Sequence, residues 1–223
     1  MPAMAETPPA GGFWALLRER ERALLMASSQ ERRVRAGRRL FEEGQRAPTL
    51  VVIVEGRVKI STVAYDGQDR LLALRGPGDL LGEMAGLIGG SRTATVTAVD
   101  DLRVMSVTRE EFERLWRKEP ALLAALVRAL VRRIEEADRA RMELLDEAPV
   151  RVRRLLADLV DRFSEPDGSG GRRIDVSLTQ AELASLAFTS RGVVASVLRD
   201  LRDRGLVHTG RRELVVTDPE ALL

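Results

Sequence analysis

The spacing of apolar residues changes several times along the chain, and each change predicts a different kind of element. Between residues 13 and 27, apolar side chains recur on a charged background at Phe13, Leu16, Leu17, Leu24 and Leu25. This spacing predicts one or two short amphipathic helices. From residue 34 to residue 107, glycines divide short β-branched runs such as residues 50–54 and 94–99. Short strands marked off by turns at intervals of roughly ten residues predict an antiparallel sandwich or barrel.

A long amphipathic helix follows the strands. Thr108 and Glu111 form a capping box that opens a first helix, and after Pro120 the helical pattern runs to about residue 145. Its apolar positions alternate between spacings of four and three residues, at Leu123, Val127, Leu130, Ile134, Ala137 and Leu144, with Arg141 as the polar residue in the register. Such a stripe is a coiled-coil seam and predicts a homodimer through residues 120–145. In the alternative interpretation, the stripe packs on its own domain.

Pro149 starts a third segment, which has shorter elements. Residues 150–163 have the pattern of a helix. Residues 164–171 are rich in serine and glycine, which predicts a flexible loop, and residues 172–177 predict a short strand.

Two short helices near the C-terminus have the spacing of a helix-turn-helix. Thr179 and Glu182 form a capping box for the first, which ends near residue 187, and Ser190 is a suitable N-cap for the second, which runs to about residue 204. The core-facing positions fit two helices that cross over a short turn: Leu183, Ala184, Leu186, Val194, Val197, Leu198 and Leu201. Gly205 ends the second helix, and the alternation of residues 206–216 predicts a hairpin wing.

A module of this kind binds DNA with its second helix in the major groove, while flanking arginines neutralise phosphates. The residues expected to contact DNA are Thr179, Gln180, Ser190, Arg191, Gly192, Val193, Ser196, Arg199, Arg211 and Arg212. Arg191 is the expected base reader because its fork matches guanine O6 and N7, and Val193 fits a thymine methyl group. Arg211 and Arg212 would hold phosphates from the wing. Residues 149–223 hold 12 arginines and 11 acidic residues, so a winged-helix module that binds protein is the alternative.

Composition excludes several classes of protein. The 223 residues include no cysteine and a single histidine, His208, which excludes disulfides, thiolate-bound zinc, iron–sulfur clusters and histidine-cysteine catalytic pairs. The 36 basic and 34 acidic residues leave a net charge of +2, and all basic residues except Lys59 and Lys118 are arginines, which suit bidentate binding of phosphate. The sequence shows no nucleophile–base pair, carboxylate dyad or phosphate loop, and we expect no enzymatic activity.

The N-terminus and the hydropathy pattern bear on location. Residues 1–12 are small and proline-rich and lack the features of a signal peptide, which predicts a disordered arm. The longest uncharged apolar run, residues 121–127, is far shorter than the ~20 residues of a membrane helix. We therefore expect a cytoplasmic protein that makes no membrane contact.

The most specific stretch of the chain is residues 76–96, which is rich in glycine and carries Glu83 and Arg92. Glycines let backbone amides approach a phosphate, a short helix beginning near Glu83 would direct its free N–H groups at it, and Arg92 can clamp an anionic diester. Glu83 can accept a ribose 2′-hydroxyl. In the alternative, Glu83 and Arg92 form an ion pair on the edge of a sandwich and close a vestigial pocket.

Residues 76–96, the glycine-marked strands, the long helix and the winged helix-turn-helix together resemble the CRP/FNR (catabolite activator) family of transcription regulators over residues 13–220. The resemblance implies an α+β fold, with an N-terminal antiparallel β jelly roll of the cyclic-nucleotide-binding type, a long dimerisation helix and a C-terminal winged helix-turn-helix. It implies sugar and phosphate contacts from residues of the 82–94 segment. The expected contacts there are Gly82, Glu83, Met84, Arg92, Thr93 and Ala94.

The chain departs from the family pattern at the base-reading positions of the ligand pocket. In cyclic AMP-responsive members, two neighbouring hydroxyl residues on the dimer helix bind the adenine. The matching positions in this chain are Ala137 and Asp138, so the hydroxyl groups are absent. An ionised Asp138 offers only acceptors, so it suits the adenine amino group or the guanine N1 and N2 donors, or it pairs with Arg141. The effector expected is cyclic AMP or another cyclic nucleotide, with no obligatory cofactor.

The recognition helix departs from the family pattern as well. Gly192 and Ser196 stand where the catabolite activator has a glutamate and an arginine that read bases, and Phe188 replaces the usual turn glycine. The operator should therefore differ from the best-known family consensus.

The resemblance implies a homodimeric regulator that binds a palindromic operator and RNA polymerase, with the recognition helices placed by a pocket ligand. Its expected segments are a disordered arm (1–12), a sensor domain (13–119), a dimerisation helix and hinge (120–148) and a DNA-binding domain (149–223). The alternatives are a constitutive DNA-binding dimer with a vestigial pocket, a cyclic-nucleotide-responsive protein-interaction module, and a cyclic-nucleotide-regulated enzyme with a degenerate C-terminal domain. The iron–sulfur and haem sensors of the family are excluded by the absence of cysteine and the single histidine.

Overall fold

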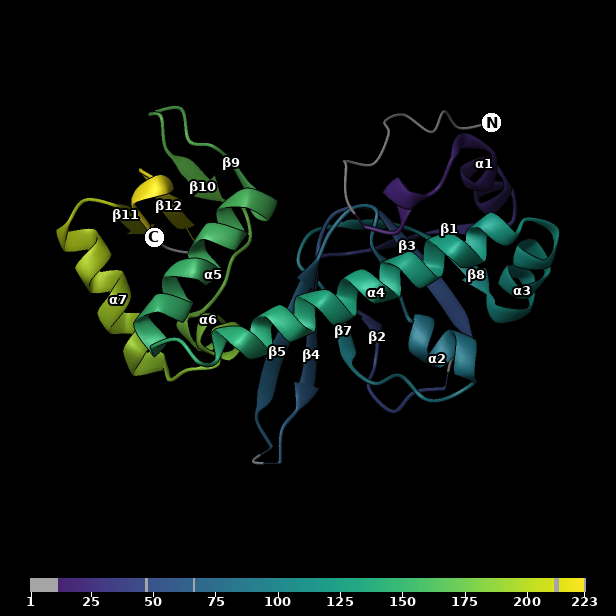
Figure 1. Cartoon of the computed structure of the whole chain (residues 1–223), viewed down its shortest axis with the longest axis horizontal. Helices are drawn as coiled ribbons and strands as arrows, with labels where there is room; N and C mark the ends of the chain where they lie inside the picture. Colours follow the sequence, from purple (N-terminus) through teal and green to yellow (C-terminus); the bar gives the residue numbers. More distant parts are fainter. Residues whose placement is uncertain (1–11, 47, 66, 211–212, 223) are drawn as a thin grey trace. The chain divides into compact units, whose positions relative to one another are not determined.

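A computed structural model of the chain describes residues 12–46, 48–65, 67–210 and 213–222 (Figure 1). They form two compact units, which divide between Glu136 and Ala137. Residues 1–11, most of the expected N-terminal arm, lie outside the described residues, as do the wing residues Arg211 and Arg212.

The first unit is an antiparallel β sandwich with helices before and after it. Its strands are β1 (Gln30–Val34), β2 (Arg39–Phe41), β3 (Thr49–Glu55), β4 (Val58–Val63), β5 (Asp69–Arg75), β6 (Leu80–Leu81), β7 (Thr95–Ala98) and β8 (Leu102–Thr108). They pair in two four-stranded sheets, with the orders β1-β8-β3-β6 and β2-β7-β4-β5. Its helices are η1 (Trp14–Leu16), α1 (Glu19–Ala27), α2 (Glu83–Ile88), α3 (Arg109–Lys118) and α4 (Pro120–Glu143), which continues into the second unit. The antiparallel sandwich and the mixed α+β class are confirmed.

Strand β3 explains why residues 50–54 are apolar without alternation. Leu50, Val52 and Val54 belong to a core between the first sheet and the helices, whereas Val51 and Ile53 belong to the core between the two sheets. Both faces of the strand are buried, so every position must be apolar. β8 also contributes to both cores, with Leu102 and Val104 between the sheets and Met105 and Val107 on the helix side, and it pairs with β3 over residues 103–108.

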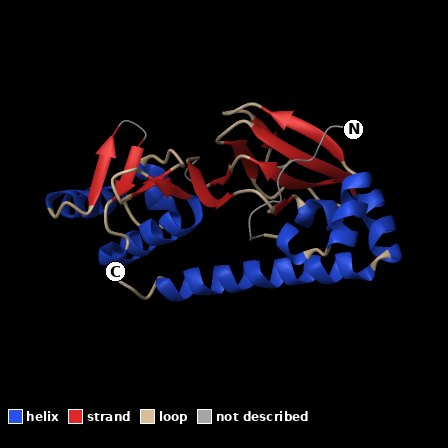
Figure 2. Cartoon of the chain, turned by 90° about the horizontal axis from the view of Figure 1, so that it is seen from above, coloured by secondary structure: helices blue, strands red, loops and turns tan. Residues whose placement is uncertain are grey.

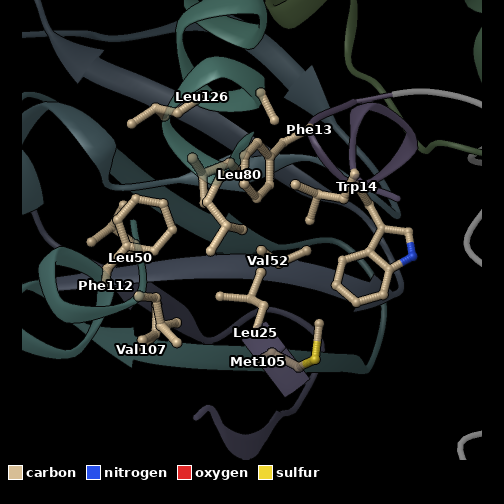
Figure 3. Close-up of a cluster of buried hydrophobic side chains, with 14 of the residues drawn as sticks. Phe13, Trp14, Leu25, Leu50, Val52, Leu80, Met105, Val107, Phe112 and Leu126 are labelled. Carbon is tan, nitrogen blue, oxygen red and sulfur yellow. The ribbon is translucent and has the colours of Figure 1, made fainter. Parts of the chain in front are cut away.

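The helix-side core holds the helices of the first unit against its sheet (Figure 3). Figure 2 shows these helices gathered on one side of the strands. Phe13 and Trp14, near the N-terminus, are buried in this core. The Phe112 ring of α3 packs edge-on against Trp116, with 5.5 Å between the ring centroids. This core anchors α4 through Leu122 and the residues that follow it on the same face, and so fixes the first half of that helix on the first unit.

The other face of α4 is free of the first unit. Leu123, Val127 and Ile134 of the predicted seam are 40%, 50% and 62% exposed, whereas Leu130 is partly buried against the helix-side core. Leu122, Ala125 and Leu126 make the contacts with the unit instead. The alternative in which the whole stripe packs on its own domain is therefore wrong for these three seam residues.

The second unit contains a four-stranded sheet and three helices. Its elements are α5 (Ala148–Phe163), β9 (Ser164–Pro166), β10 (Arg172–Ile174), α6 (Gln180–Leu186), α7 (Arg191–Asp203), β11 (Val207–Gly210), β12 (Glu213–Val216) and η2 (Glu220–Leu222). The sheet order is β11-β12-β10-β9. Among the described residues, no single helix is long and apolar enough to cross a membrane; α6 and α7 reach that length only jointly, across a 105° bend.

The predicted flexible loop 164–171 is wrong in its first half. Residues 164–166 form β9, which pairs antiparallel with β10. The turn between the two strands is closed by Asp167, whose Oδ1 accepts hydrogen bonds from the backbone N–H groups of Ser169 at 2.9 Å and Gly171 at 2.8 Å. The sequence showed the turn residues but not the strand pairing, because a three-residue strand leaves too short a pattern to recognise.

Candidate functional site

The candidate ligand site is built around Gly82, which joins β6 to α2. Gly82 has a φ of +77°, a left-handed conformation that favours glycine. A Cβ atom at this position would collide with Nη1 of Arg92 and lie 3.0 Å from the Thr49 carbonyl oxygen. Glycine is therefore required here twice, by the backbone conformation and by the close approach of the arginine.

Arg92 is buried, with 4% of its surface exposed. Its Nη1 donates to the Gly82 carbonyl at 3.0 Å, and its Nη2 donates to the carbonyl and to the hydroxyl of Thr49, both at 2.9 Å. The guanidinium lies 3.6 Å from the centroid of the Phe41 ring. Burial lowers the pKa of Arg92 below its ordinary value, and the nearby Glu83 carboxylate opposes that change. A buried cation whose hydrogen-bond partners are all neutral is stabilised by a nearby anion.

Glu83, the first residue of α2, is also buried, with 6% of its surface exposed. Its partner is Arg133 of α4, which forms an ion pair with Glu83 Oε1 and also donates to the Leu80 carbonyl. The alternative in which Glu83 pairs with Arg92 is therefore wrong. A buried carboxylate needs a cation, and α4 supplies it.

Arg133 was not among the residues chosen from the sequence. The signal was present, because Arg133 lies four residues before Ala137 and so on the same face of α4 as a position expected to meet the base. The pairing itself joins residues 50 positions apart, and that contact is visible only in the folded chain.

The other expected ligand contacts are placed as follows. Met84 is 53% exposed, and the hydroxyl of Thr93 lies 3.9 Å from its sulfur. Ala94 is half-buried. Ala137 and Asp138 are exposed residues of α4 that belong to the second unit, so their approach to residues 82–94 stays a prediction. The described residues show no ion pair between Asp138 and Arg141.

The helix-turn-helix of the second unit has the caps that the sequence predicts. The Thr179 hydroxyl accepts from the Glu182 N–H at 3.1 Å, and Glu182 Oε2 accepts from the Thr179 N–H at 2.7 Å. The Ser190 hydroxyl accepts from the Val193 N–H at 3.3 Å. α6 and α7 meet at 105°, an angle typical of the motif.

The N-terminal end of α7 presents most of the expected DNA contacts to solvent. The exposed ones are Thr179, Gln180, Ser190, Arg191, Gly192, Ser196 and Arg199, and Val193 is half-buried. Arg191 is the first residue of α7, and neither it nor Arg199 forms an ion pair within the described part of the chain. Two unpaired guanidinium groups on one exposed helix suit an anionic partner.

The predicted hairpin wing is confirmed. Val207 to Gly210 pair with Val216 to Glu213. Arg202 of α7 donates to the Leu198 carbonyl at 3.1 Å and to the Thr209 hydroxyl at 3.4 Å, which ties the wing to the recognition helix. A cavity of about 220 Å³ lies beneath this contact, between α6, α7 and the wing, with Ile174 and Leu183 in its lining.

Phe188, in the turn between α6 and α7, has a φ of +49°. It is the one non-glycine residue with a positive φ in the described ranges, and its side chain is 57% exposed. Burial of the ring therefore does not offset the strain of the left-handed conformation. In the sequence, Phe188 stands where the family usually has a glycine in the turn. The positive φ of Phe188 explains that glycine, because glycine adopts this conformation without strain.

Replacing Phe188 by glycine should stabilise the protein by about 1 kcal/mol, because the left-handed conformation costs an ordinary residue roughly 1–2 kcal/mol and the freedom of unfolded glycine offsets part of that. Chemical unfolding of wild type and Phe188→Gly measures the difference. The matched control is Ala195→Gly within α7, which should destabilise by about 1 kcal/mol. A Phe188→Gly protein less stable than wild type would contradict the prediction.

The fold and the two sites define a class: a ligand-binding β sandwich linked by a long helix to a DNA-binding helix-turn-helix. Residues 31–119 match the model of the cyclic nucleotide-binding domain, and residues 150–223 match the Crp-like helix-turn-helix domain. The chain belongs to the CRP/FNR family of transcription regulators.

Curated relatives cover most of the chain. It is 32% identical to the CRP-like cAMP-activated global transcriptional regulator of Mycobacterium tuberculosis, over 83% of each chain. It is 34% identical to the cyclic AMP receptor protein of Thermus thermophilus, over 84% of this chain and 83% of the relative. The first of these relatives is named as a cAMP-activated transcriptional regulator, and the second as a receptor for cyclic AMP.

Solved structures agree on the fold. The catabolite activator protein of Thermus thermophilus is similar at 32% identity and a TM-score of 0.54, covering 94% of this chain and 95% of that one. The c-di-GMP responsive global regulator CLP of Xanthomonas campestris has a TM-score of 0.76 over 90% of this chain and 100% of its own, at 24% identity. The second comparison supports the architecture alone.

Proposed function

We propose that the chain is a homodimeric transcription regulator whose DNA binding is set by a cyclic nucleotide. The observation that carries the proposal is the pair of buried opposite charges in a cyclic nucleotide-binding domain: Glu83, which follows Gly82, and Arg92, which donates to the Gly82 carbonyl. The proposed parts are a sensor domain (13–119), a dimerisation helix and hinge (120–148) and a DNA-binding domain (149–223). Both relatives described above are named for cyclic AMP.

In the proposed pocket the phosphate and the ribose of the ligand have protein partners. Arg92 binds the cyclic phosphate, because a charge-assisted bond to an anion is stronger than its present bonds to neutral oxygens. Glu83 accepts the ribose 2′-hydroxyl and is held in place by Arg133. Backbone amides near Gly82 and Met84, together with Thr93 and Ala94, complete the sugar–phosphate contacts. Ala137 and Asp138 face the base.

The proposed DNA-binding surface is the N-terminal end of α7 with its flanking elements. Arg191 reads a base, and Thr179, Gln180 and Arg199 contact the backbone of the duplex. In a two-fold dimer the two recognition helices fit half-sites about 34 Å apart on a palindromic operator. Ligand shifts the protein toward this arrangement only by binding it more tightly than the other. RNA polymerase is the protein partner of such a cytoplasmic regulator.

Calorimetry tests the sensor half of the proposal. Protein shown by mass spectrometry to be free of nucleotide is titrated with cyclic AMP and, separately, with cyclic GMP. We expect heat from at least one of them and, in a gel shift with selected DNA, tighter binding in its presence. Absence of heat with both at millimolar concentration would contradict the sensor function.

One observation favours a second candidate, a constitutive DNA-binding dimer with a closed pocket. Arg92 already has three hydrogen bonds to protein oxygens, and Glu83 already has Arg133. Gel shifts separate the candidates. Operator binding that is the same with and without every cyclic nucleotide supports the constitutive dimer, whereas ligand-dependent binding supports the regulated one.

The dimer has its own test on α4. Ile134→Glu places a charge in the middle of the exposed seam, where Ile134 is 62% exposed in the single chain. Because an unpaired carboxylate does not tolerate burial, we expect the variant to be monomeric at micromolar concentration in sedimentation velocity, where wild type is dimeric. Arg132→Glu, an exposed position on another face of the helix, should stay dimeric. A dimeric Ile134→Glu protein would contradict the proposed interface.

A further inference from the structure

Arg151 of α5 lies at the centre of a hydrogen-bond cluster and is not one of the residues proposed to contact DNA. Its Nε donates to the Ala187 carbonyl at 3.0 Å and its Nη2 to the Phe188 carbonyl at 2.9 Å. Its Nη1 donates to the Asp146 carbonyl at 2.6 Å. One rigid guanidinium thus holds two consecutive carbonyls of the α6–α7 turn and one carbonyl of the connection between α4 and α5.

The turn depends on this guanidinium for two reasons. Ala187 and Phe188 follow the C-terminal end of α6, where carbonyl groups lack partners within the helix and a cation is favourable. Phe188 is also held in a left-handed conformation with its ring exposed. The N–H groups of Phe188 and Thr189 are bonded within the turn, to the carbonyls of Ser185 and Ala184. The carbonyls of Ala187 and Phe188 are bonded by Arg151, which thereby helps to maintain the shape of the turn.

The shape of the turn fixes where the recognition helix begins. Phe188 is two residues before Ser190, the N-cap of α7, and three before Arg191, the expected base reader. The body of α7 is held separately by buried Val194, Val197, Leu198 and Leu201. Loss of Arg151 should therefore leave α7 packed in the unit but change the direction of its first turn.

The other end of the cluster is the connection after α4. Arg154, one helical turn beyond Arg151, forms an ion pair with the Asp146 carboxylate. Asp146 is thus bound through its backbone by Arg151 and through its side chain by Arg154. The connection and the α6–α7 turn are therefore held at a fixed separation by one face of α5.

We infer that Arg151 is a positioning residue for DNA recognition: it fixes the α6–α7 turn and thereby the direction in which Ser190 and Arg191 reach the bases. The inference rests on the proposed DNA-binding function. It assigns Arg151 no contact with DNA, and its contribution is to specificity rather than to general affinity for phosphate.

The test compares specific and non-specific DNA binding in a variant that keeps the charge. DNA bound by wild type is selected from a random pool, and dissociation constants are measured for the selected duplex and for random duplex. Arg151→Lys retains a cation but loses the fork. We expect its affinity for the selected duplex to fall at least tenfold and its affinity for random duplex to stay within twofold, in protein with an unchanged circular dichroism spectrum.

Two further variants test whether the effect of Arg151→Lys on DNA binding acts through the α6–α7 turn. Arg151→Lys combined with Phe188→Gly should regain most of the lost preference, because glycine adopts the left-handed turn without support. Arg162→Lys is the matched control, since Arg162 is on the same helix but contacts Asp158, at 3.2 Å, and the Phe163 ring rather than the turn. This variant should bind both duplexes as wild type does.

Each other outcome overturns the inference. An Arg151→Lys protein that binds the selected duplex like wild type shows that the fork does not position the turn. Equal losses on both duplexes show a general structural role instead. Wild type without preference for any selected duplex overturns the proposed DNA-binding function itself, and the inference with it.

Discussion

Arg92→Gln should lower the affinity for the cyclic nucleotide about 10- to 150-fold, because a hydrogen bond to a charged group contributes roughly 1.5–3 kcal/mol and each 1.4 kcal/mol is a factor of about ten. Arg92 is the buried cation of the pocket, and it lies against the ring of Phe41 and the oxygens of Thr49 and Gly82. Glutamine keeps a donor but removes the charge. Calorimetry with the cyclic nucleotide that binds wild type measures the change.

The matched control for Arg92 is Arg103→Gln on β8. Arg103 pairs with Glu55 and Glu31 in the same unit, and none of the three belongs to the proposed pocket. Its removal should leave nucleotide binding unchanged. Because Arg92 also stabilises the loop around Gly82, thermal unfolding must show that Arg92→Gln is folded at the titration temperature. A folded variant with wild-type affinity would mean that Arg92 does not touch the phosphate.

Arg191→Ala should lower the affinity for the selected operator about 5- to 150-fold and relax the preference at one base pair of each half-site, since a bidentate arginine–guanine contact contributes roughly 1–3 kcal/mol. Arg191 is exposed at the first position of α7, where a side chain points to the base edges. Gel shifts with operators changed one base pair at a time measure both effects.

Arg204→Ala is the control for Arg191, because it removes the same charge at the other end of the recognition helix. Arg204 caps α7 and pairs with Asp200 at 3.6 Å. We expect its variant to bind all operators within about twofold of wild type, with the base preference intact. If Arg191→Ala weakened every operator equally, Arg191 would be a phosphate contact and the base reader would be another residue.

Much of the fold follows from patterns that are local in the sequence. The capping box at Thr179, the N-cap at Ser190 and the left-handed Gly205 each act over a few residues, and each is present as predicted. Hydrophobic spacing likewise predicted α4 and the helix-turn-helix, because helix formation depends on neighbours three and four positions away.

The sequence determined less about the strands. It marked the turns of the sandwich by glycine, but β9 was missed, because a short strand is stabilised by its partner across the sheet rather than by its own residues. Similarly, the apolar run of residues 50–54 predicted a strand, but not that one face of β3 packs on the helices and the other on the second sheet.

The residue types of the candidate site were determined by the sequence: Gly82, Glu83 and Arg92 are the residues proposed to bind the ribose and the cyclic phosphate. Their partners were decided only by the tertiary structure. Glu83 turned out to pair with Arg133 rather than with Arg92, and Arg151 joins the α6–α7 turn to the connection at Asp146. Local patterns record what each short segment can form by itself, whereas a buried charge takes its partner from whichever distant segment the fold brings within hydrogen-bond distance.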